Sequence, residues 1–353
     1  PATPEEQAEL ARYTGFGASE IANHMFPGWA ESGKIQMWRV DSKWKPLVER
    51  MVQLLTPEEI ATAARSTQYA HYTSAPIIAS IYQALEKFGF TGGRVLEPGM
   101  GVGSFFGLMP EAMRAQSKYT GIEMDGITAA IAKHLYPLQN IIEGDYTKQR
   151  FPNGFFDLGI GNPPFSAIKI LADPAYKKLR LSLHDFFFIK TLDKIRPGGL
   201  MVFITSRYTM DKKDDRVRKM LNESADLLGA IRLPQTAFKH NAGTEVVTDI
   251  LFLRKKVPGE QTQGQLWKDV APVDTPEGEF LINEYFAAHP EMVLGLHSGK
   301  GKMYGSQAQY TVLPAEGNIE EAFAAAAANL PKDVYSVAHA SPATQEAAAI
   351  EKD

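Results

Sequence analysis

A run of mostly apolar residues, from Phe155 to Gly161, ends directly in the tetrapeptide Asn162-Pro163-Pro164-Phe165. Such a run, without strict alternation of polar residues, predicts a strand that is buried on both faces, as in the parallel sheets of α/β proteins. In open α/β sheets ligands bind beyond the carboxyl ends of the strands. The loop after this strand, with an amide, two rigid prolines and an aromatic ring, is therefore predicted to form a binding surface. By itself, the tetrapeptide could also be only a rigid exit from a strand.

A second stretch, residues 94–106, predicts a short strand that runs into a glycine-rich turn and then a helix. Glycines at 99, 101 and 103 allow the backbone to approach a ligand closely. Their Gly-x-Gly-x-Gly spacing differs from the dinucleotide fingerprint, and the Lys-Ser/Thr pair of a P-loop is absent. Glu97, at the end of this strand, would favour a positively charged ligand and repel a pyrophosphate.

Two further predicted strands also end in acidic residues. The strand 119–123 ends in Glu123, and the strand 140–145 ends in Asp145. Glu123 follows Gly103 by 20 residues, a spacing at which a carboxylate can accept hydrogen bonds from ribose hydroxyls. Each acid alone could be a turn residue, but three parallel strands that all end in acids, opposite a glycine turn, favour a ligand site.

Ahead of these strands, apolar residues at helical spacing follow Thr73-Ser74-Ala75-Pro76. Thr73 or Ser74 is predicted to cap this helix, with Pro76 in its first turn. The free N–H groups of a helix N-terminus can bind a carboxylate, although this segment alone indicates only a well-capped helix.

Basic residues gather in the second half of the predicted sheet. Residues 176–256 contain 17 Lys and Arg against 9 Asp and Glu, a net charge of +8 in a chain whose formal charge is −4. This is typical of a face that binds a polyanion, although the mixed charges of the predicted helix 212–221 equally fit a solvated helix. The candidate nucleic-acid contacts are Arg207, Lys212, Lys213, Arg216, Lys239 and His240.

Composition excludes several classes of site. The chain has no cysteine, which excludes disulfides, thiolate metal sites and a cysteine nucleophile. The 8 histidines lack metal-ligand spacing, so no metal site is predicted. No stretch has the length of a membrane span and no signal peptide opens the chain, so we expect a cytoplasmic protein without a membrane partner.

The glycine turn, Glu123, Asp145 and the tetrapeptide resemble, in order and spacing, the S-adenosylmethionine-dependent amino-methyltransferases. They resemble most closely the gamma-class N6-adenine DNA methyltransferases, over about residues 68–256. The segments 12–17 and 283–295 also resemble the methyltransferase portion of phage and plasmid methyltransferase–helicase fusion proteins. The first motif of this family usually begins with Asp, where this chain has Glu97.

The resemblance implies a Rossmann-like class I methyltransferase fold of the α/β class, with a mostly parallel seven-stranded sheet. Residues 1–66 would form a helical N-terminal cap and residues 67–256 the catalytic domain. Residues 257–353 would form a small C-terminal region with a DNA-recognition element and a linker. Because the chain begins with Pro1, we expect it to be a piece of a longer protein that contains a helicase domain.

The same resemblance implies S-adenosylmethionine as the cofactor and double-stranded DNA as the partner. The catalytic residues would be Asn162, Pro163, Pro164 and Phe165. The residues that would bind the cofactor are Thr73, Glu97, Pro98, Gly99, Gly101, Gly103, Phe105, Glu123, Asp145 and Asn162.

In the implied mechanism, a flipped adenine stacks on Phe165. The side-chain oxygen of Asn162 and the carbonyl of Pro163 accept hydrogen bonds from its amino group. Adenine-N6 methylation of RNA, cytosine-N4 methylation of DNA, protein-glutamine methylation and a catalytically silent DNA-binding subunit stay open as alternatives.

Overall fold

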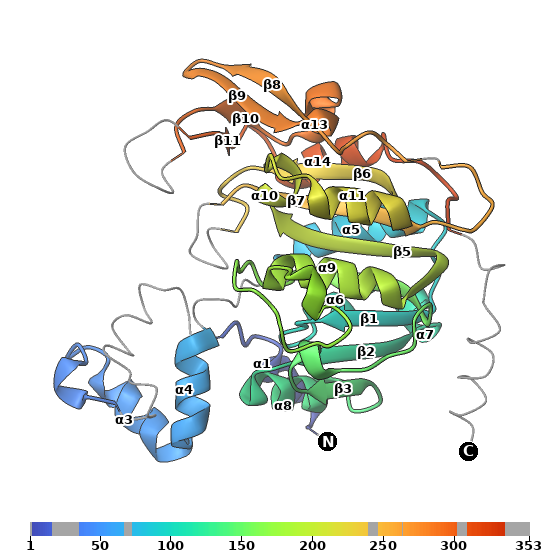
Figure 1. The fold of residues 1–353 in the computed structure, drawn as a ribbon. Helices are drawn as coiled ribbons and strands as arrows, with labels where there is room; N and C mark the ends of the chain where they lie inside the picture. The colour runs from blue at the N-terminus through green and yellow to red at the C-terminus, as the bar shows by residue number, and fades with distance from the viewer. Residues whose placement is uncertain are drawn as a thin grey trace, which may run out of the picture.

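The computed structural model describes residues 2–15, 35–66, 73–238, 246–262, 264–301 and 309–335. Its centre is a seven-stranded sheet with the strand order β3-β2-β1-β4-β5-β7-β6 (Figure 1). The strands are β1 (Arg94–Pro98), β2 (Lys118–Glu123), β3 (Asn140–Glu143), β4 (Phe156–Gly161), β5 (Ile195–Ser206), β6 (Ala225–Leu233) and β7 (Thr248–Lys255). Neighbouring strands are parallel, except that β7 is antiparallel to β5 and β6. The expected α/β class and mostly parallel seven-stranded sheet are confirmed.

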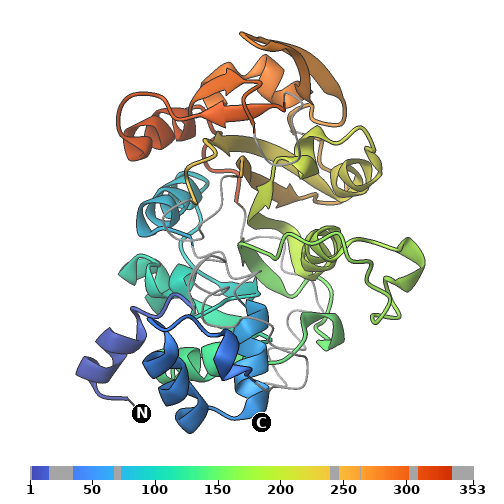
Figure 2. The same cartoon turned by 90° about the vertical axis from the view of Figure 1, so that its left-hand side faces the viewer.

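Helices cover both faces of this sheet. Helix α5 (Ala75–Lys87) lies on one face, and α9 (Leu183–Lys194) and α11 (Arg216–Ser224) lie on the other (Figures 1 and 2). All residues of the central strand β4 are buried. This two-sided burial explains why the sequence at this strand is mostly apolar and lacks the alternation of a strand with one wet face.

The remaining helices are short. They are α1 (Pro4–Leu10), α3 (Lys45–Leu54), α4 (Pro57–Ser66), α6 (Ser104–Gly107), α7 (Glu111–Ala115), α8 (Gly126–Leu135), α10 (Tyr208–Asp211), α13 (Glu284–Ala288) and α14 (Ile319–Ala327), with 3₁₀ turns η1 (Met37–Arg39), η2 (Tyr146–Lys148), η3 (Lys177–Leu179) and η4 (Pro290–Met292). Helices α3 and α4 share a small hydrophobic cluster around Val48, Met51 and Ile60. In Figure 1 they lie on the left, beyond the carboxyl ends of the central strands.

A C-terminal layer packs on the β6 edge of the sheet (Figure 1). It contains the pair β8 (Val270–Thr275) and β9 (Gly278–Asn283), and the pair β10 (Leu296–Ser298) and β11 (Thr311–Leu313). Arg232 of β6 is fully buried below it and donates to Asp249 over 2.7 Å and to Asp211 over 2.8 Å. The backbone N–H of Asn283 donates to the same Asp211 oxygen over 2.9 Å, which joins the layer to the sheet.

Two predicted helix boundaries are wrong. Residues 281–289, for which the sequence predicts a short helix, are helical only from Glu284, because Asn283 ends strand β9 and its side chain caps α13 by accepting from the N–H of Tyr285. The basic helix expected from Lys212 begins at Arg216, and its N–H donates to the side chain of Asp214.

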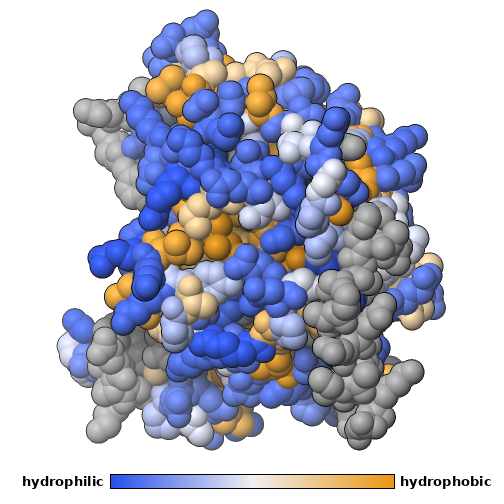
Figure 3. All heavy atoms as spheres, turned by 45° about the vertical axis from the view of Figure 1, so that its right-hand side comes forward, coloured by the Kyte–Doolittle hydropathy of each residue, from blue (hydrophilic) through white to orange (hydrophobic). Residues whose placement is uncertain are grey.

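None of the helices in these described ranges is long and apolar enough to cross a membrane. The face of the molecule drawn in Figure 3 is mostly hydrophilic, with hydrophobic residues gathered across its middle.

Candidate active site

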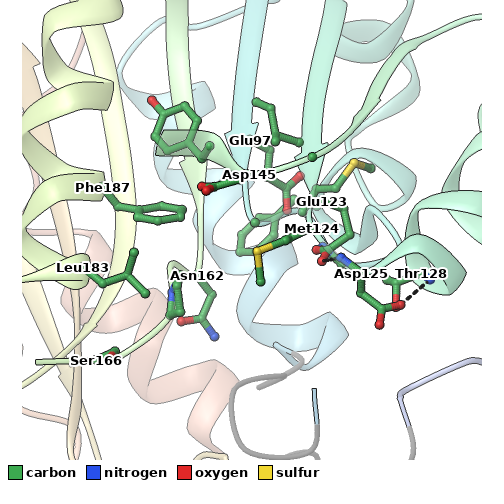
Figure 4. Close-up of a pocket in the computed structure, with 18 of the residues that line it drawn as sticks. Glu97, Glu123, Met124, Asp125, Thr128, Asp145, Asn162, Ser166, Leu183 and Phe187 are labelled. Carbon is green, nitrogen blue, oxygen red and sulfur yellow. Dashed lines mark hydrogen bonds between the residues drawn. The ribbon is translucent and has the colours of Figure 1, made fainter. Parts of the chain in front are cut away.

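A cavity of about 390 Å³ lies where strands β1 to β4 end. The predicted site residues that line it are Thr73, Glu97, Gly99, Gly101, Phe105, Glu123, Asp145, Asn162 and Pro164. Figure 4 shows Asn162, Leu183 and Phe187 on one side of this cavity, and Glu123, Met124 and Asp125 on the other. Four other predicted residues, Pro98, Gly103, Pro163 and Phe165, do not line it.

The glycine turn forms one wall of the cavity. Gly99, Gly101 and Gly103 have φ angles of 71°, 57° and 81°, a region that residues with a Cβ rarely adopt. The N–H of Gly99 donates to the Ile122 carbonyl over 2.8 Å, which ties the turn to the end of β2. A Cβ on Gly103 would lie 2.6 Å from the ring of Tyr136, so this position has space for glycine alone.

Glu97 is buried at the end of β1 and accepts a hydrogen bond from the hydroxyl of Tyr119. Its carboxyl group has no ion pair within the described part of the chain. Burial raises the pKa of Glu97 well above its ordinary value, and the Tyr119 hydrogen bond opposes this only in part. The longer side chain of Glu, in place of the Asp usual in the resembled family, is thus accommodated against Tyr119. A positive charge nearby would favour the ionised form of Glu97, and a cationic ligand in the cavity could supply that charge.

Two acidic residues stand together at the end of β2. Glu123 accepts from the N–H of Gly101 over 2.9 Å and from the N–H of Asp125 over 2.8 Å. Asp125 caps α8, with its Oδ1 accepting from the N–H of Thr128 over 2.7 Å. Its Oδ2 is buried and has no hydrogen-bond partner among the described residues. A buried acceptor without a partner beside a cavity indicates a place for a donor of a ligand. Asp125 was not predicted, although its position two residues after Glu123 was visible in the sequence.

Asp145 lies beyond the end of β3 and accepts from the N–H of Thr147 over 2.8 Å. Helix α4 of the N-terminal region also reaches the cavity, because Thr62 is part of its lining. Burial, and after it the Asp125 carboxylate, raise the pKa of Tyr13 to about 12. In the segment 12–17, which resembles part of the fusion proteins, Phe16 and Gly17 lie outside the described residues. No sequence pattern pointed to Thr62.

The loop after β4 forms the opposite wall. The amide nitrogen of Asn162 donates to the Thr73 hydroxyl over 3.5 Å, which brings the loop to the start of α5. Ser74 is the N-cap residue of α5, one of the two residues expected there, but its side chain makes no cap hydrogen bond. Phe165 packs edge-on against His184, with 5.3 Å between ring centroids, and its ring is not part of the cavity lining.

His184 of α9 supports this loop from behind. Its Nδ1 is 3.3 Å from the carbonyl oxygen of Pro164, and its Nε2 is 3.0 Å from the Thr209 hydroxyl, with the Thr205 hydroxyl also in contact. Because a carbonyl can only accept, Nδ1 must carry the proton, and Nε2 accepts from a hydroxyl. Burial lowers the pKa of His184 to about 4, so the ring is neutral at pH 7. Nothing in the sequence pattern pointed to this histidine.

The predicted nucleic-acid contacts are in different environments. Lys212 is ion-paired with Asp185 over 3.2 Å, and Arg207 is 3.4 Å from Asp211 and stacks on Tyr208. Lys213 and Arg216 are exposed, and Arg216 donates to the Leu179 carbonyl over 3.0 Å. Lys239 and His240 lie outside the described residues. In the ranges that the structure describes, no three acidic or histidine side chains are grouped so that they could hold a metal ion.

Comparison with known sequences finds a distant relative. No family model matches the chain. The chain is 29% identical over 198 residues, 55% of its length, to Defense against restriction protein B of Escherichia phage P1. The matched stretch is only 8% of that relative, so the chain spans less than a tenth of its length.

Comparison with solved structures identifies the fold. A Listeria monocytogenes protein assigned to the class I S-adenosylmethionine-dependent methyltransferases matches with a TM-score of 0.50 and 16% identity, over 74% of this chain and 92% of that one. A modification subunit assigned to a type I restriction enzyme of Vibrio vulnificus YJ016 matches with a TM-score of 0.47 and 14% identity, over 78% of this chain and 64% of the other. The match to the Listeria protein confirms the expected Rossmann-like class I methyltransferase fold.

Proposed function

We propose that this chain is an S-adenosylmethionine-dependent DNA methyltransferase that transfers a methyl group to the N6 amino group of adenine. One observation carries the proposal. A single cavity at the carboxyl ends of the strands is lined by the glycine turn, by acids from three strands, and by Asn162 and Pro164 of the β4 loop. The site for the methyl donor and the site for the amino group that accepts the methyl are thereby within reach of each other.

The cavity suits a cationic nucleoside as cofactor. Its volume of about 390 Å³ is within the range of small-molecule sites. Glu97 offers a buried carboxyl that a positive ligand would stabilise in its ionised form, and Asp125 offers a buried acceptor without a partner in the described chain. Glu97 and the glycine turn would hold the amino-acid part, Glu123 and Asp125 the ribose hydroxyls, and Asp145 the adenine ring.

When bound, S-adenosylmethionine supplies a methyl group on a sulfonium, which a nitrogen lone pair can accept while the electrons of the C–S bond stay on sulfur; the nitrogen then loses one proton to water. The lone pair of the adenine amino group is delocalised into the ring. Hydrogen bonds from its two N–H groups to the Asn162 side-chain oxygen and the Pro163 carbonyl would make this lone pair available and orient it. Pro164 is held by His184, which keeps the loop at a fixed place relative to the cavity.

Adenine in DNA is favoured over the alternatives by two observations. The tetrapeptide Asn162-Pro163-Pro164-Phe165 has asparagine where cytosine-N4 enzymes more often have serine. The relative from phage P1 is named for defence against restriction, and methylation of DNA is a modification that blocks restriction. We therefore place the activity in restriction-modification or anti-restriction, in a longer parent chain.

The test is methyl transfer from labelled S-adenosylmethionine to unmodified genomic DNA, followed by digestion to nucleosides. Label should appear in N6-methyldeoxyadenosine. Asn162→Ala should lower the rate by about 100-fold or more, the effect of removing one hydrogen-bonding group from a polar catalytic site. Asn329→Ala, at an exposed position in the C-terminal region, is the matched control and should have the parent rate.

Label in N4-methylcytosine, or label in RNA or in a protein glutamine when these acceptors are offered in place of DNA, would assign the chain to that alternative. Cofactor binding without transfer to any of these acceptors would indicate the silent subunit. Equal rates for Asn162→Ala and the parent would contradict the proposed acceptor site.

A further inference from the structure

A hairpin of residues 166–182 lies between the β4 loop and α9. Its stem is closed by two backbone hydrogen bonds, from Leu183 N–H to the Ile168 carbonyl over 2.7 Å and from Ile170 N–H to the Leu181 carbonyl over 2.9 Å. Lys169 and Ser182 form a β-bridge in the same stem. The 166–182 hairpin therefore has a defined shape directly beside the loop that lines the cavity.

Buried polar contacts anchor the hairpin to the sheet domain. Asp173 is only 2% exposed, and it accepts from Lys190 over 2.9 Å and from Arg150 over 3.3 Å. Tyr176 is also buried, and its hydroxyl donates to Asp193 over 2.7 Å. Asp173 is the only acidic residue between 166 and 182, so this anchoring uses the only negative charge of the hairpin.

The outer side of the hairpin is basic. Lys169, Lys177, Lys178 and Arg180 are all exposed, and none of them has an ion pair within the described part of the chain. This differs from Arg207 and Lys212, which were predicted as nucleic-acid contacts but are paired with acids of the protein. Four unneutralised cations on an anchored hairpin form a strong local positive charge.

Apolar side chains accompany these cations. Ile168 lines the cavity and is nevertheless 62% exposed, which places it at the opening. Leu171, further along the hairpin, is 47% exposed. Proteins that kink or open a duplex combine contacts to phosphates with apolar side chains set against the bases. A protein ligand of such a basic surface would instead need acidic side chains.

We propose that the 166–182 hairpin binds nucleic-acid phosphates through Lys177, Lys178 and Arg180, and that Ile168 contacts the bases at the opening of the cavity. This inference rests on the proposed function, because it assigns the hairpin to the substrate of that site. It adds the surface that holds the duplex while the target base enters.

The experiment compares two double variants of equal charge change in binding to a fluorescent mixed-sequence DNA duplex of about 30 base pairs. Lys177→Ala/Lys178→Ala removes two hairpin cations. Arg114→Ala/Lys118→Ala removes two exposed cations at the amino end of β2, the end of the strand opposite to the cavity. Affinity is measured by anisotropy between 0.05 and 0.2 M NaCl, with S-adenosylhomocysteine present.

Log affinity falls with log salt. The hairpin pair should make this negative slope shallower by about 1.8, because each lost phosphate contact contributes about 0.9. Extrapolated from equal affinity at 1 M salt, this change in slope corresponds to a loss of affinity of about 60-fold at 0.1 M salt. The control pair should keep the slope of the parent protein. Ile168→Ala should weaken binding without changing the slope, since an apolar contact releases no counterions.

Equal slopes for the hairpin pair and the control pair would overturn the inference, whether both keep the slope of the parent or both change it by the same amount. Failure of the proposed function has another signature. If the parent binds DNA through the hairpin but labels RNA or protein instead, then adenine methylation of DNA is wrong while the hairpin result stands.

Discussion

Replacement of His184 by asparagine tests whether a neutral, buried imidazole holds the catalytic loop. An unperturbed histidine has a pKa of about 6.5, and burial lowers the pKa of His184 to about 4. Between these values the unfolded chain binds a proton that the folded chain does not bind. Stability that depends on His184 is therefore present at pH 7 and is lost as the pH falls from about 6.5 towards 4. Between pH 7 and pH 5 the loss is about 2 kcal/mol of unfolding free energy.

The His184→Asn variant lacks this titration but retains an amide donor near the Pro164 carbonyl. Its free energy of unfolding should be lower than that of the parent at pH 7, and the deficit should shrink by about 2 kcal/mol at pH 5. Urea unfolding at both pH values measures the two deficits. His134→Asn, at an exposed position in α8, is the control and should show no such change. A deficit of His184→Asn that is the same at both pH values would refute the assignment of a buried neutral ring.

Three further predictions concern the cofactor wall and the core. Burial raises the pKa of Glu97, and a cationic ligand favours its ionised form. Affinity for S-adenosylmethionine should therefore rise as the pH increases through that pKa. Calorimetric titration should show this rise in the parent protein but not in Glu97→Gln. Gly103→Ala should lower the unfolding free energy by about 1–3 kcal/mol in urea, because φ is 81° and a Cβ would meet Tyr136; an unchanged midpoint would contradict the close packing. Arg232→Ala should destabilise the protein by about 3–5 kcal/mol by leaving Asp249 buried and unpaired, and a second change, Asp249→Ala, should recover part of the lost thermal stability.

The fold and much of the candidate site follow local rules that the sequence displays. The mostly apolar run at 155–161 predicts a strand with both faces buried, and the structure has β4 at the centre of the sheet. The glycines at 99, 101 and 103 predict a turn after the first strand, and in the structure all three have positive φ. The roles of the individual site residues stay predictions until methyl transfer and binding are measured.

Other parts of the site depend on contacts between residues that are far apart in sequence. Lys212 and Asp185 are separated by 27 residues, and their ion pair could not be predicted from the composition of either segment. His184 has no local signal, since only the folding of α9 against β5 brings it to Pro164 and Thr205. The predicted helix starts at Lys212 and Leu281 are wrong for a similar reason. Local polar contacts and the pairing of β9 delay the start of these helices to Arg216 and Glu284.

The sequence by itself determined where strands, turns and acidic residues follow one another along the chain, because burial periodicity and backbone freedom are local properties. Only the tertiary structure decided which charges are neutralised. Asp173 anchors the 166–182 hairpin through Lys190, while Lys177 and Lys178 face solvent. The sequence does not distinguish a paired lysine from an exposed one. The electrostatic role of a lysine depends on its distance to an acid that another part of the chain supplies.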